Sequence, residues 1–344
     1  LSAIMDLIQA AWMIRDLGQP VSALDLEEDS VIAGGWDGAL RKWNGDGDLM
    51  WKAQCSDRIE SILRIEDLVL VTSGLHISCL KDGEILWSEA LEGSADLLAF
   101  HDGEIVATSS VYDIEHGDFM ESAIWRFSLE GDLLNVERMD ERPWFLDSKD
   151  KLLLGLGRPK CGILVDGEHQ NLPTDSPVTC GLYGRENVLF GHANGVITSL
   201  KGEIISEESS SIESISCVEK GFVAALESGE LVAKTPDSKP IWKASGKQVT
   251  TQVAGFDDMH WCGRWNSSNG VVEVRDSKGE LIVTAKTTRP RVSDYSENRI
   301  GFGFEDGQIL VWEKGLFSRR IDQEKGEENS RKSALAAKLR SLRN

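Results

Sequence analysis

Apolar and polar residues alternate along most of this chain in short runs of four to eight residues, with turn residues between the runs. A period of two is typical of β-strands that are buried on one face. One such run opens each copy of a repeating unit of about 34 to 48 residues. The eight opening runs are VSALDL (21–26), IESILRI (59–65), ADLLAF (95–100), PWFLDS (143–148), VTCGLY (178–183), IESISCV (212–218), VTTQVAGF (249–256) and RVSDYS (291–296).

Three further runs follow each opening run, as SVIAGGW, ALRKWN and DLMWKAQ follow the first. Glycine stands at the hairpin positions of most units, for example at Asp37-Gly38, Asp306-Gly307, Asp82-Gly83 and Lys278-Gly279. Tight hairpin turns favour glycine because their central residues need positive φ. The sequence therefore predicts an all-β fold, an eight-bladed β-propeller of four-stranded antiparallel blades, with seven blades as the alternative.

The segment NGDGDL (44–49) alternates oxygen-bearing side chains with glycine, as a calcium loop does. An EF-hand loop needs glycine at its sixth position and glutamate at its twelfth. Counted from Asn44, these positions hold Leu49 and Cys55. The glycines fit the recurring hairpin turn instead, so the segment is predicted to be a turn.

Two sets of motifs resemble known propeller families. DGALRKW (37–43) and DGQILVW (306–312) resemble degenerate WD40 blades, and GDLMW (47–51), GEILW (83–87) and PIW (240–242) resemble the tryptophan-docking blades of quinoprotein-type (PQQ-like) propellers. The resemblance covers roughly residues 5–320. It implies that Trp12, Trp51, Trp87 and Trp242 pack between blades. Quinone-dependent dehydrogenases of this type use a calcium site, but no such ligand set is identifiable here, so no cofactor is expected.

The two ends of the chain compete to close the ring. Trp12 precedes the first opening run by nearly the spacing that separates Trp51 from the second, which predicts that residues 8–17 form the outer strand of the last blade. LFSRRID (316–322) is the competing strand, and if it wins, the amino-terminal segment is a capping strand or helix. The predicted organisation is a propeller over 1–323, followed by a linker and helix over 324–344.

The last residues, RKSALAAKLRSLRN (331–344), carry five basic side chains and no acidic one. Ser330 is a candidate N-cap, and Leu335, Leu339 and Leu342 share one helical face. The pattern predicts a short basic amphipathic helix, with a disordered or frayed terminus as the alternative. Such a helix would dock on an acidic or apolar protein surface, or on anionic lipid.

Composition limits the classes of partner and the cellular location that we expect for this protein. The 57 acidic residues outnumber 37 Lys and Arg, for a net charge of −20, so nucleic acid is not expected to bind. The six cysteines are scattered without a C-x-x-C pair, which favours a reducing compartment and a cytoplasmic location. No apolar run reaches the roughly 18 residues of a membrane span.

Catalytic motifs are missing from the sequence: there is no G-x-S-x-G, P-loop or dinucleotide fingerprint, and no H-x-x-x-H pair. A non-enzymatic protein is therefore expected. One lengthened connection, at 112–120, contains Asp113, Glu115, His116 and Asp118. Metal binding is one hypothesis for this loop, and an acidic solvated loop is the favoured one.

Our hypothesis from sequence is an interaction scaffold that binds protein partners through loops on one rim, with help from the carboxyl-terminal helix. The candidate contact residues are Trp36, Arg158, His192, Trp265, Glu305, Leu335, Leu339 and Leu342. The alternative is an enzyme or small-ligand binder that uses the central channel. Its expected lining residues are Ser22, Glu60, Asp96, Thr179, Glu213, Thr250 and Ser293.

Overall fold

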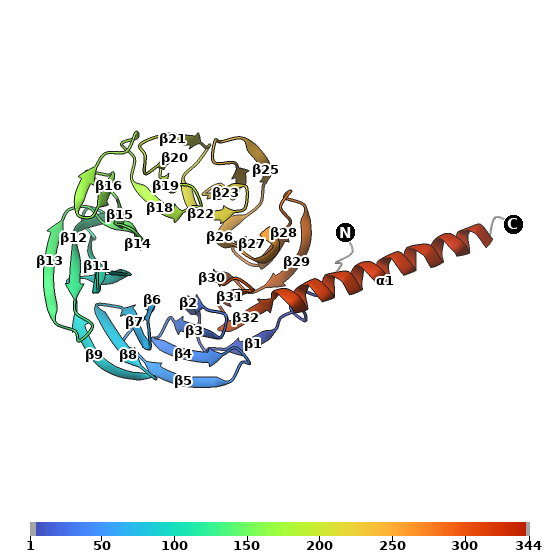
Figure 1. Ribbon diagram of the computed structural model, residues 1–344, viewed down its shortest axis with the longest axis horizontal. Helices are drawn as coiled ribbons and strands as arrows, with labels where there is room; N and C mark the ends of the chain where they lie inside the picture. Colours follow the sequence, from blue (N-terminus) through green and yellow to red (C-terminus); the bar gives the residue numbers. More distant parts are fainter. Residues whose placement is uncertain (1–4, 342–344) are drawn as a thin grey trace.

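Eight four-stranded sheets surround a central opening (Figure 1). The computed structural model describes residues 5–341, with side chains up to residue 339. The strands within each sheet pair antiparallel, and in the last sheet β1 pairs with β32 in this way. The predicted eight-bladed β-propeller is confirmed, and the seven-bladed alternative is wrong.

The blades are numbered in chain order, and each comprises four consecutive strands except the last. Blades 1 to 4 contain β2 (Val21–Leu26), β3 (Ser30–Gly35), β4 (Ala39–Asn44), β5 (Leu49–Gln54); β6 (Ile59–Ile65), β7 (Leu68–Ser73), β8 (His76–Lys81), β9 (Glu84–Ala90); β10 (Ser94–His101), β11 (Glu104–Asp113), β12 (Asp118–Phe127), β13 (Leu133–Met139); and β14 (Pro143–Ser148), β15 (Leu152–Leu156), β16 (Ile163–Val165), β17 (Glu168–Gln170). Blades 5 to 8 contain β18 (Val178–Tyr183), β19 (Val188–His192), β20 (Val196–Ser199), β21 (Ile204–Glu207); β22 (Ile212–Val218), β23 (Gly221–Leu226), β24 (Leu231–Lys234), β25 (Pro240–Ala244); β26 (Gln248–Ala254), β27 (His260–Trp265), β28 (Gly270–Arg275), β29 (Leu281–Thr287); and β30 (Pro290–Tyr295), β31 (Arg299–Phe304), β32 (Gln308–Glu313), β1 (Met13–Asp16). A 3-10 turn, η1 (Phe256–Asp258), joins β26 to β27.

The eight predicted opening runs coincide with the innermost strands of the blades. Each inner strand contacts the inner strand of the next blade, and the last one contacts β2, which completes the circle around the opening (Figure 1). Apolar side chains of neighbouring blades pack together between the sheets. The alternating inner strands are buried in part, whereas second strands such as β3 are buried along their whole length between neighbouring blades.

The segment NGDGDL forms the turn between β4 and β5. The Asn44 side-chain oxygen accepts hydrogen bonds from the backbone N–H groups of Asp46 at 3.0 Å and Asp48 at 2.9 Å. Gly47 has a φ of 90°, a conformation that favours glycine. The prediction of a hairpin turn is confirmed.

The amino-terminal end closes the ring. β1 pairs with β32, with Met13 opposite Val311 and Asp16 opposite Gln308. The predicted outer strand is thus present over 13–16, whereas residues 8–12 precede it without strand structure. The competing segment, 316–322, is helical.

Helix α1 (Lys314–Ser341) begins immediately after β32. Glu313 caps its first turn, because its carboxylate oxygens accept hydrogen bonds from the N–H groups of Gly315 at 2.9 Å and Leu316 at 2.8 Å. Phe317 and Ile321 bury one face of the first two turns against blades 7 and 8. The expected start at Ser330 and the expected linker over 324–330 are therefore wrong, since the helix runs through both.

Beyond Ile321, α1 projects away from the ring (Figure 1). Its 28 residues span roughly 42 Å at the helical rise per residue. Leu335 and Leu339 are 60% and 56% exposed, and Leu342 lies outside the described residues. Among residues 5–341, no helix combines the length and apolarity that crossing a membrane requires.

Tryptophans on the outer strands pack between blades, as predicted. A bulge in β9 places Trp87 opposite Cys79, and its indole Nε1 donates to the carbonyl of Leu129 in the next blade at 2.9 Å. A Cβ atom on Gly131 would lie only 2.6 Å from this ring, so glycine is needed beneath it. Bulges at the same point of β5 and β25 present Trp51 and Trp242 in the same way.

Trp12, the residue immediately before β1, makes a related contact. Its Nε1 donates to the carbonyl of Gly45 at 2.9 Å, and 43% of the residue stays exposed. The junction of blades 7 and 8 is filled differently. There Trp261 and Trp312 lie 4.9 Å apart between ring centroids, and Phe317 packs 5.1 Å from Trp261. The start of α1 thus seals this junction.

Candidate interaction surfaces on the two rims

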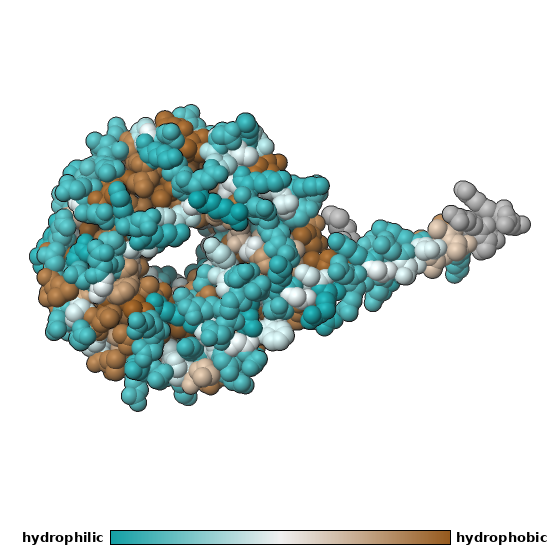
Figure 2. Space-filling view, in the orientation of Figure 1, coloured by the Kyte–Doolittle hydropathy of each residue, from teal (hydrophilic) through white to brown (hydrophobic). Residues whose placement is uncertain are grey.

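The ring has two unlike rims. We call the rim where each inner strand begins the entry rim. It carries the connections between blades and the turns between second and third strands. The rim where each inner strand ends is the exit rim, and it carries the other two sets of turns. Figure 2 shows the ring hollowed at its centre, with hydrophobic residues gathered over β20 and β21.

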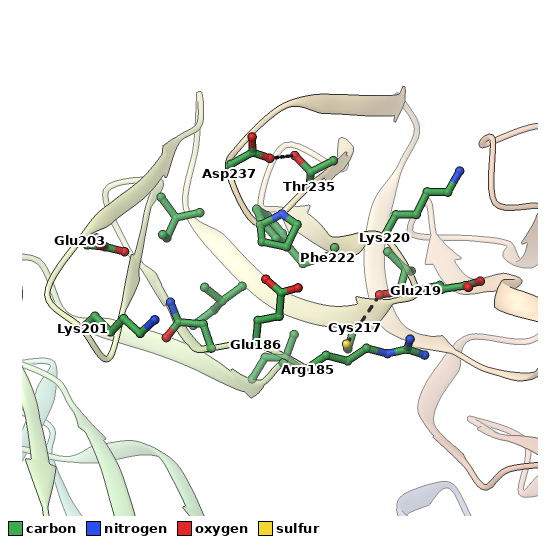
Figure 3. Close-up of a pocket in the computed structure, with 18 of the residues that line it drawn as sticks. Arg185, Glu186, Lys201, Glu203, Cys217, Glu219, Lys220, Phe222, Thr235 and Asp237 are labelled. Carbon is green, nitrogen blue, oxygen red and sulfur yellow. Dashed lines mark hydrogen bonds between the residues drawn. The ribbon is translucent and has the colours of Figure 1, made fainter.

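Two large hollows lie on the exit rim. A groove of about 920 Å³ separates blades 5 and 6 and is lined by turns of both (Figure 3). A second hollow of about 920 Å³ lies beside it, with contributions from blades 4 to 8. Neither hollow is lined by a residue that the sequence singled out for partner binding.

The entry rim gathers arginine and aromatic side chains from different blades. Trp36, in the turn after β3, is 37% exposed. The guanidinium carbon of Arg58 lies 4.0 Å from its ring centroid, and that of Arg291 lies 4.9 Å away. Glu305 forms an ion pair with Arg291. Blades 1, 2 and 8 therefore meet in one cation–π cluster.

The cluster continues into blade 7. The guanidinium carbon of Arg289 lies 5.7 Å from the ring centroid of Trp265. The hydrogen bond from Arg291 lowers the pKa of Glu305 despite its partial burial, and Arg289 adds to this effect. Glu305 is thus held as a carboxylate between two cations.

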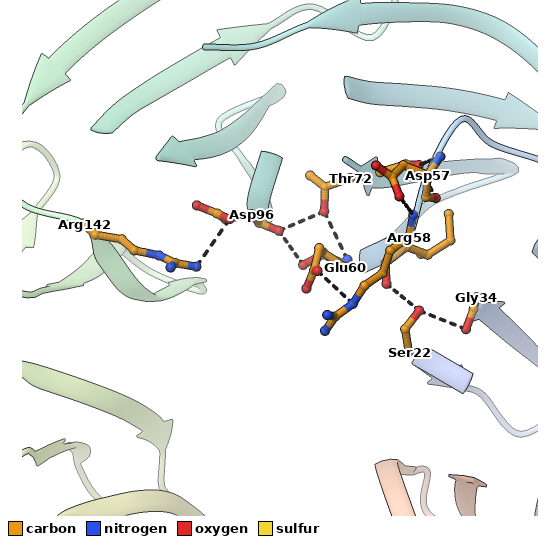
Figure 4. Close-up of polar contacts among 11 residues, drawn as sticks. Ser22, Gly34, Asp57, Arg58, Glu60, Thr72, Asp96 and Arg142 are labelled. Atoms are coloured by element: carbon orange, nitrogen blue, oxygen red, sulfur yellow. Dashed lines mark hydrogen bonds and ion pairs between the residues drawn. The ribbon is translucent and has the colours of Figure 1, made fainter. Parts of the chain in front are cut away.

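A second group of arginine and aromatic side chains lies on blades 3 and 4, and Figure 4 shows its Arg142 directed at Asp96. Arg142 lies between two rings, 3.9 Å from the centroid of Phe119 and 4.1 Å from that of Trp144. Its guanidinium also forms an ion pair with Asp96 at 3.4 Å. Burial raises the pKa of Asp96, while a hydrogen bond from Ser110 and the charge of Arg142 oppose the rise.

Glu60 stands between these two parts. It pairs with Arg58 at 3.0 Å, and its pKa is raised by burial while the Arg58 charge opposes the rise. We call the whole set the arginine–aromatic arc. Its members are Trp265, Arg289, Glu305, Arg291, Trp36, Arg58, Glu60, Arg142, Trp144 and Phe119.

The structure brings three of the candidate contact residues together in this arc: Trp36, Glu305 and Trp265. Arg158 lies beside its blade 3 and blade 4 end, 72% exposed at the side chain and 3.5 Å from a carboxylate oxygen of Asp118. It lines a hollow of about 320 Å³ that also includes Trp144.

His192 is buried, and the expectation that it contacts a partner is wrong. Its Nδ1 lies 2.9 Å from the carbonyl of Ser176, and its Nε2 lies 2.8 Å from the hydroxyl of Thr198. Burial lowers the pKa of this imidazole, so the neutral ring is favoured. His192 stabilises the end of its blade instead.

The loop at 112–120 is a tight turn between two long strands, β11 and β12. A side-chain oxygen of Asp113 accepts the N–H groups of Glu115 at 2.8 Å and His116 at 3.2 Å, and its other oxygen lies 3.0 Å from His116 Nδ1. Within residues 5–341, no group of three or more His, Cys, Asp or Glu side chains is arranged to hold a metal ion. The Asp113 side chain thus organises the turn itself.

Hydroxyls on the inner strands connect neighbouring blades. Ser22 donates to the carbonyl of Ile59 at 2.7 Å, and Thr179 donates to that of Ile212 at 2.5 Å. Asp294 acts similarly, since it accepts the N–H of Leu26 at 2.7 Å, and burial raises its pKa to about 6. Several polar groups expected to line the channel are therefore used to hold the ring together.

Sequence reasoning missed the arginines of the arc. Arg58, Arg142, Arg289 and Arg291 all stand at the start of an inner strand or just before it. This shared position is a sequence signal that could have placed them on one rim. Their aromatic partners come from other blades, so the pairs themselves could not be read from the chain.

The comparisons with known proteins agree with the fold. No family model and no curated protein matches the sequence. The chain is similar to the crystal structure of BamB from Moraxella catarrhalis, with a TM-score of 0.73 and 14% identity over 88% of this chain and 97% of that one. It is also similar to Sqt1 from Saccharomyces cerevisiae, with a TM-score of 0.70 and 13% identity over 88% of this chain and 98% of that one.

A third similar structure is the C-terminal WD40 domain of Sif2, with a TM-score of 0.67 and 10% identity over 88% of this chain and 98% of that one. Both WD40-type and BamB-type rings are therefore among the structural neighbours. At such low identity the similarity shows the fold alone, which is a β-propeller.

Proposed function

We propose that this protein is a non-catalytic scaffold that binds a partner protein across the arginine–aromatic arc of the entry rim. The observation that carries the proposal is the cluster of Trp36 with Arg58 and Arg291. Tryptophan and arginine are the side chains most enriched among residues that dominate binding energy at protein interfaces. Here they are exposed in part, and neighbouring blades already fix their positions.

The arc also suits recognition of a partner with both charge signs. Three of its four arginines pair with Glu60, Asp96 and Glu305, so the rim carries both cations and carboxylates. A fixed pattern of both charge signs favours one orientation of a partner over others. The aromatic rings between them supply apolar contact area.

The repeats are best assigned to the WD40-like and quinoprotein-type group. This finer assignment rests on Trp51, Trp87 and Trp242, which dock on the next blade in the manner that the motif resemblance implies. The cysteines among the described residues are all free, which supports a reducing, cytoplasmic setting.

The projecting part of α1 is a second contact surface in this proposal. Leu335 and Leu339 are exposed on one face, next to basic residues such as Arg331 and Lys332. These side chains suit an acidic or apolar protein surface, and anionic lipid is the other chemistry that would attract them.

The experiment is affinity purification from the native organism with quantitative mass spectrometry, using Trp36→Ala beside the unmodified protein. A partner bound by the arc should fall about tenfold or more in recovery, because truncating such an anchor commonly costs over 2 kcal/mol of binding. Met50→Ala is the control, since Met50 is 56% exposed on the outer strand β5. Equal recovery of all partners with Trp36→Ala would contradict the proposal.

The alternative, a small ligand in the channel, is supported by the hollow at its exit mouth, which is lined by Lys149, Arg185 and Lys220 as well as by Asp257 and Glu297. A metabolite screen by thermal shift tests it. A ligand that raises the melting temperature of the unmodified protein and of Trp36→Ala equally would favour this alternative over the arc.

A further inference from the structure

The groove between blades 5 and 6 occupies the place that a tryptophan side chain fills one junction further on. The bulge in β25 places Trp242 opposite Ala233. The bulge at the same point of β21 places Ser206 opposite Ile197. Ser206 is therefore the structural counterpart of Trp242, and it lacks a side chain large enough to fill the junction.

The walls of the two junctions correspond as well. In blade 6, Phe222 pairs with Lys234, the last residue of the third strand β24. In blade 7, His260 pairs with Arg275, the last residue of the third strand β28, so Phe222 and His260 hold equivalent positions. The ring of His260 lies 5.6 Å from that of Trp242 between centroids, whereas Phe222 lines the groove. The space left beside Trp242 is about 10 Å³, whereas the groove between blades 5 and 6 has about 920 Å³ and is lined by Ile205, the neighbour of the buried Ser206.

The floor and edge of the groove have the anatomy of a binding site for an apolar side chain. Leu189, Val218 and Phe222 form a buried floor, and Ile204 is 49% exposed at the side. Charged side chains of both signs surround this floor, among them Arg185 and Glu186 (Figure 3). A polar border around a desolvated apolar pocket is typical of interface anchors.

At another junction that lacks this tryptophan, a side chain from outside the blades fills the space. Between blades 7 and 8, the counterpart of Trp242 is Val283, opposite Val274. There Phe317 from α1 joins the same apolar cluster, together with Leu7. Between blades 5 and 6, no residue from outside these two blades lines the groove within the described part of the chain.

We propose that the groove binds a tryptophan side chain presented by a partner protein. The molecule's own junctions define this chemistry, because an indole is what the corresponding space holds. The groove also offers a hydrogen-bond acceptor, which the junction of blades 2 and 3 identifies. There the indole of Trp87 donates to the carbonyl of Leu129. Leu129 is the second residue of a turn in which the N–H of Gly131 donates to the carbonyl of Ser128 at 3.1 Å.

Pro236 holds the same second position in the turn closed by Ser238 N–H to Thr235 carbonyl at 2.9 Å, and it lines the groove. Its carbonyl corresponds to the acceptor that Leu129 offers to an indole. The groove is larger than one indole, so the residues that flank the tryptophan also fit inside it. This site goes beyond the entry-rim function, and it lies on the other rim.

The first experiment measures binding of N-acetyl-tryptophanamide with a fluorinated indole, by fluorine NMR. The full-length protein should broaden and shift the signal with a dissociation constant in the millimolar range, as befits a single small anchor. Ile204→Glu should weaken binding about tenfold by placing a charge against the indole. Ile85→Glu is the matched control, because Ile85 pairs with Leu80 as Ile204 pairs with Thr198, beside a junction that Trp87 already fills.

The second experiment fills the groove from within. Ser206→Trp should abolish probe binding, and Ser206→Ala should retain it, which separates filling from loss of the Ser206 contacts with Glu208 and Lys234. If Ser206→Trp does not fold, the comparison of probe binding by Ile204→Glu and Ile85→Glu still tests the proposal. Equal binding by the Ile204 and Ile85 variants, or equal competition by N-acetyl-leucinamide, would overturn the proposal.

A third experiment identifies the partner chemistry directly. A random-peptide phage library selected on the unmodified protein, and counter-selected on Ile204→Glu, should enrich peptides with a tryptophan at a fixed position. Enrichment of peptides without tryptophan would overturn the proposal. Self-association of the protein that Ile204→Glu abolishes would also overturn it, because a second copy of the chain would then occupy the groove. Trp36→Ala should bind the probe normally, so failure here is distinguishable from failure of the entry-rim function.

Discussion

Blades 6 and 7 meet around Trp242, and blades 5 and 6 meet around Ser206, with the same bulge and the same strand register at both junctions. The first junction retains about 10 Å³ of free space and the second about 920 Å³. The backbone alone therefore does not decide whether a junction is closed. At these two junctions the closed space and the open one differ at one side chain of the outer strand, whereas at the junction of blades 7 and 8, where that position holds Val283, Phe317 fills the space.

Ser206 has a structural role of its own in the open junction. Lys234 Nζ lies 2.8 Å from its hydroxyl and 2.5 Å from a carboxylate oxygen of Glu208, and the side chains of this pair are only 15% and 6% exposed. A buried ion pair requires extra hydrogen bonds to offset its desolvation. The open junction is thus held by a polar network where the closed one is held by an indole.

The strongest test of the comparison opens the closed junction. Trp242→Ala should lower the free energy of unfolding by about 3 kcal/mol, because it deletes a large side chain packed between two blades. Urea denaturation measures this loss. The variant should also acquire weak binding of N-acetyl-tryptophanamide at the new space, and a stability equal to that of the unmodified protein would show that the indole is not part of the core.

Two glycines in equivalent turns provide the next test. Gly279 has a φ of 84°, and a Cβ atom there would lie 2.5 Å from Trp242; Gly202 has a φ of 81° with no neighbour within 4 Å. Gly202→Ala should cost roughly 1 kcal/mol through backbone strain alone. Gly279→Ala should cost about 2 kcal/mol or more, since the indole must also move. Equal melting temperatures for the two variants would contradict the docking of Trp242 on this turn.

The last test concerns pH. Burial lowers the pKa of His260 to about 3, and the charges of Arg275 and Arg264 add to the shift. An unfolded histidine has a pKa of about 6.5, so the unfolded chain takes up this proton first as the pH falls. Stability is therefore lost below about pH 6.5, and the loss continues down to about pH 3.

His260→Phe, which copies Phe222 of the open junction, should remove this contribution. Between about pH 6.5 and pH 5 the unmodified protein should lose roughly 1 to 2 kcal/mol more stability than the variant. Urea denaturation at both pH values measures the difference. Parallel losses in the two proteins would show that His260 is not held neutral beside Trp242.

The architecture was predictable because each blade repeats its own signals. Alternating runs located the eight inner strands, and glycines such as Gly47 located the hairpins. The amino-terminal strand was predictable from the spacing of Trp12. All of these features depend on residues close together in sequence, where periodicity and turn chemistry are informative.

The functional surfaces depend on contacts between blades, which one sequence does not show. Arg291 meets Trp36 only because the ring brings blade 8 beside blade 1. His192 looked like a rim residue, but the pleat turns its side chain into the blade. The start of α1 was not predicted because Gly315 is a poor helix former, although the spacing of Phe317 and Ile321 was a helical signal.

The closure of blade 8 also sets an order of events in time. Trp312 donates through Nε1 to the carbonyl of Leu7, 305 residues earlier in the chain, next to the pairing of β1 with β32. During synthesis, β1 emerges before the other strands of the ring and its partner β32 emerges after them, so β1 stays unpaired while seven blades are made. The nascent propeller is an open arc until then, and a single late step joins its earliest strand to its latest.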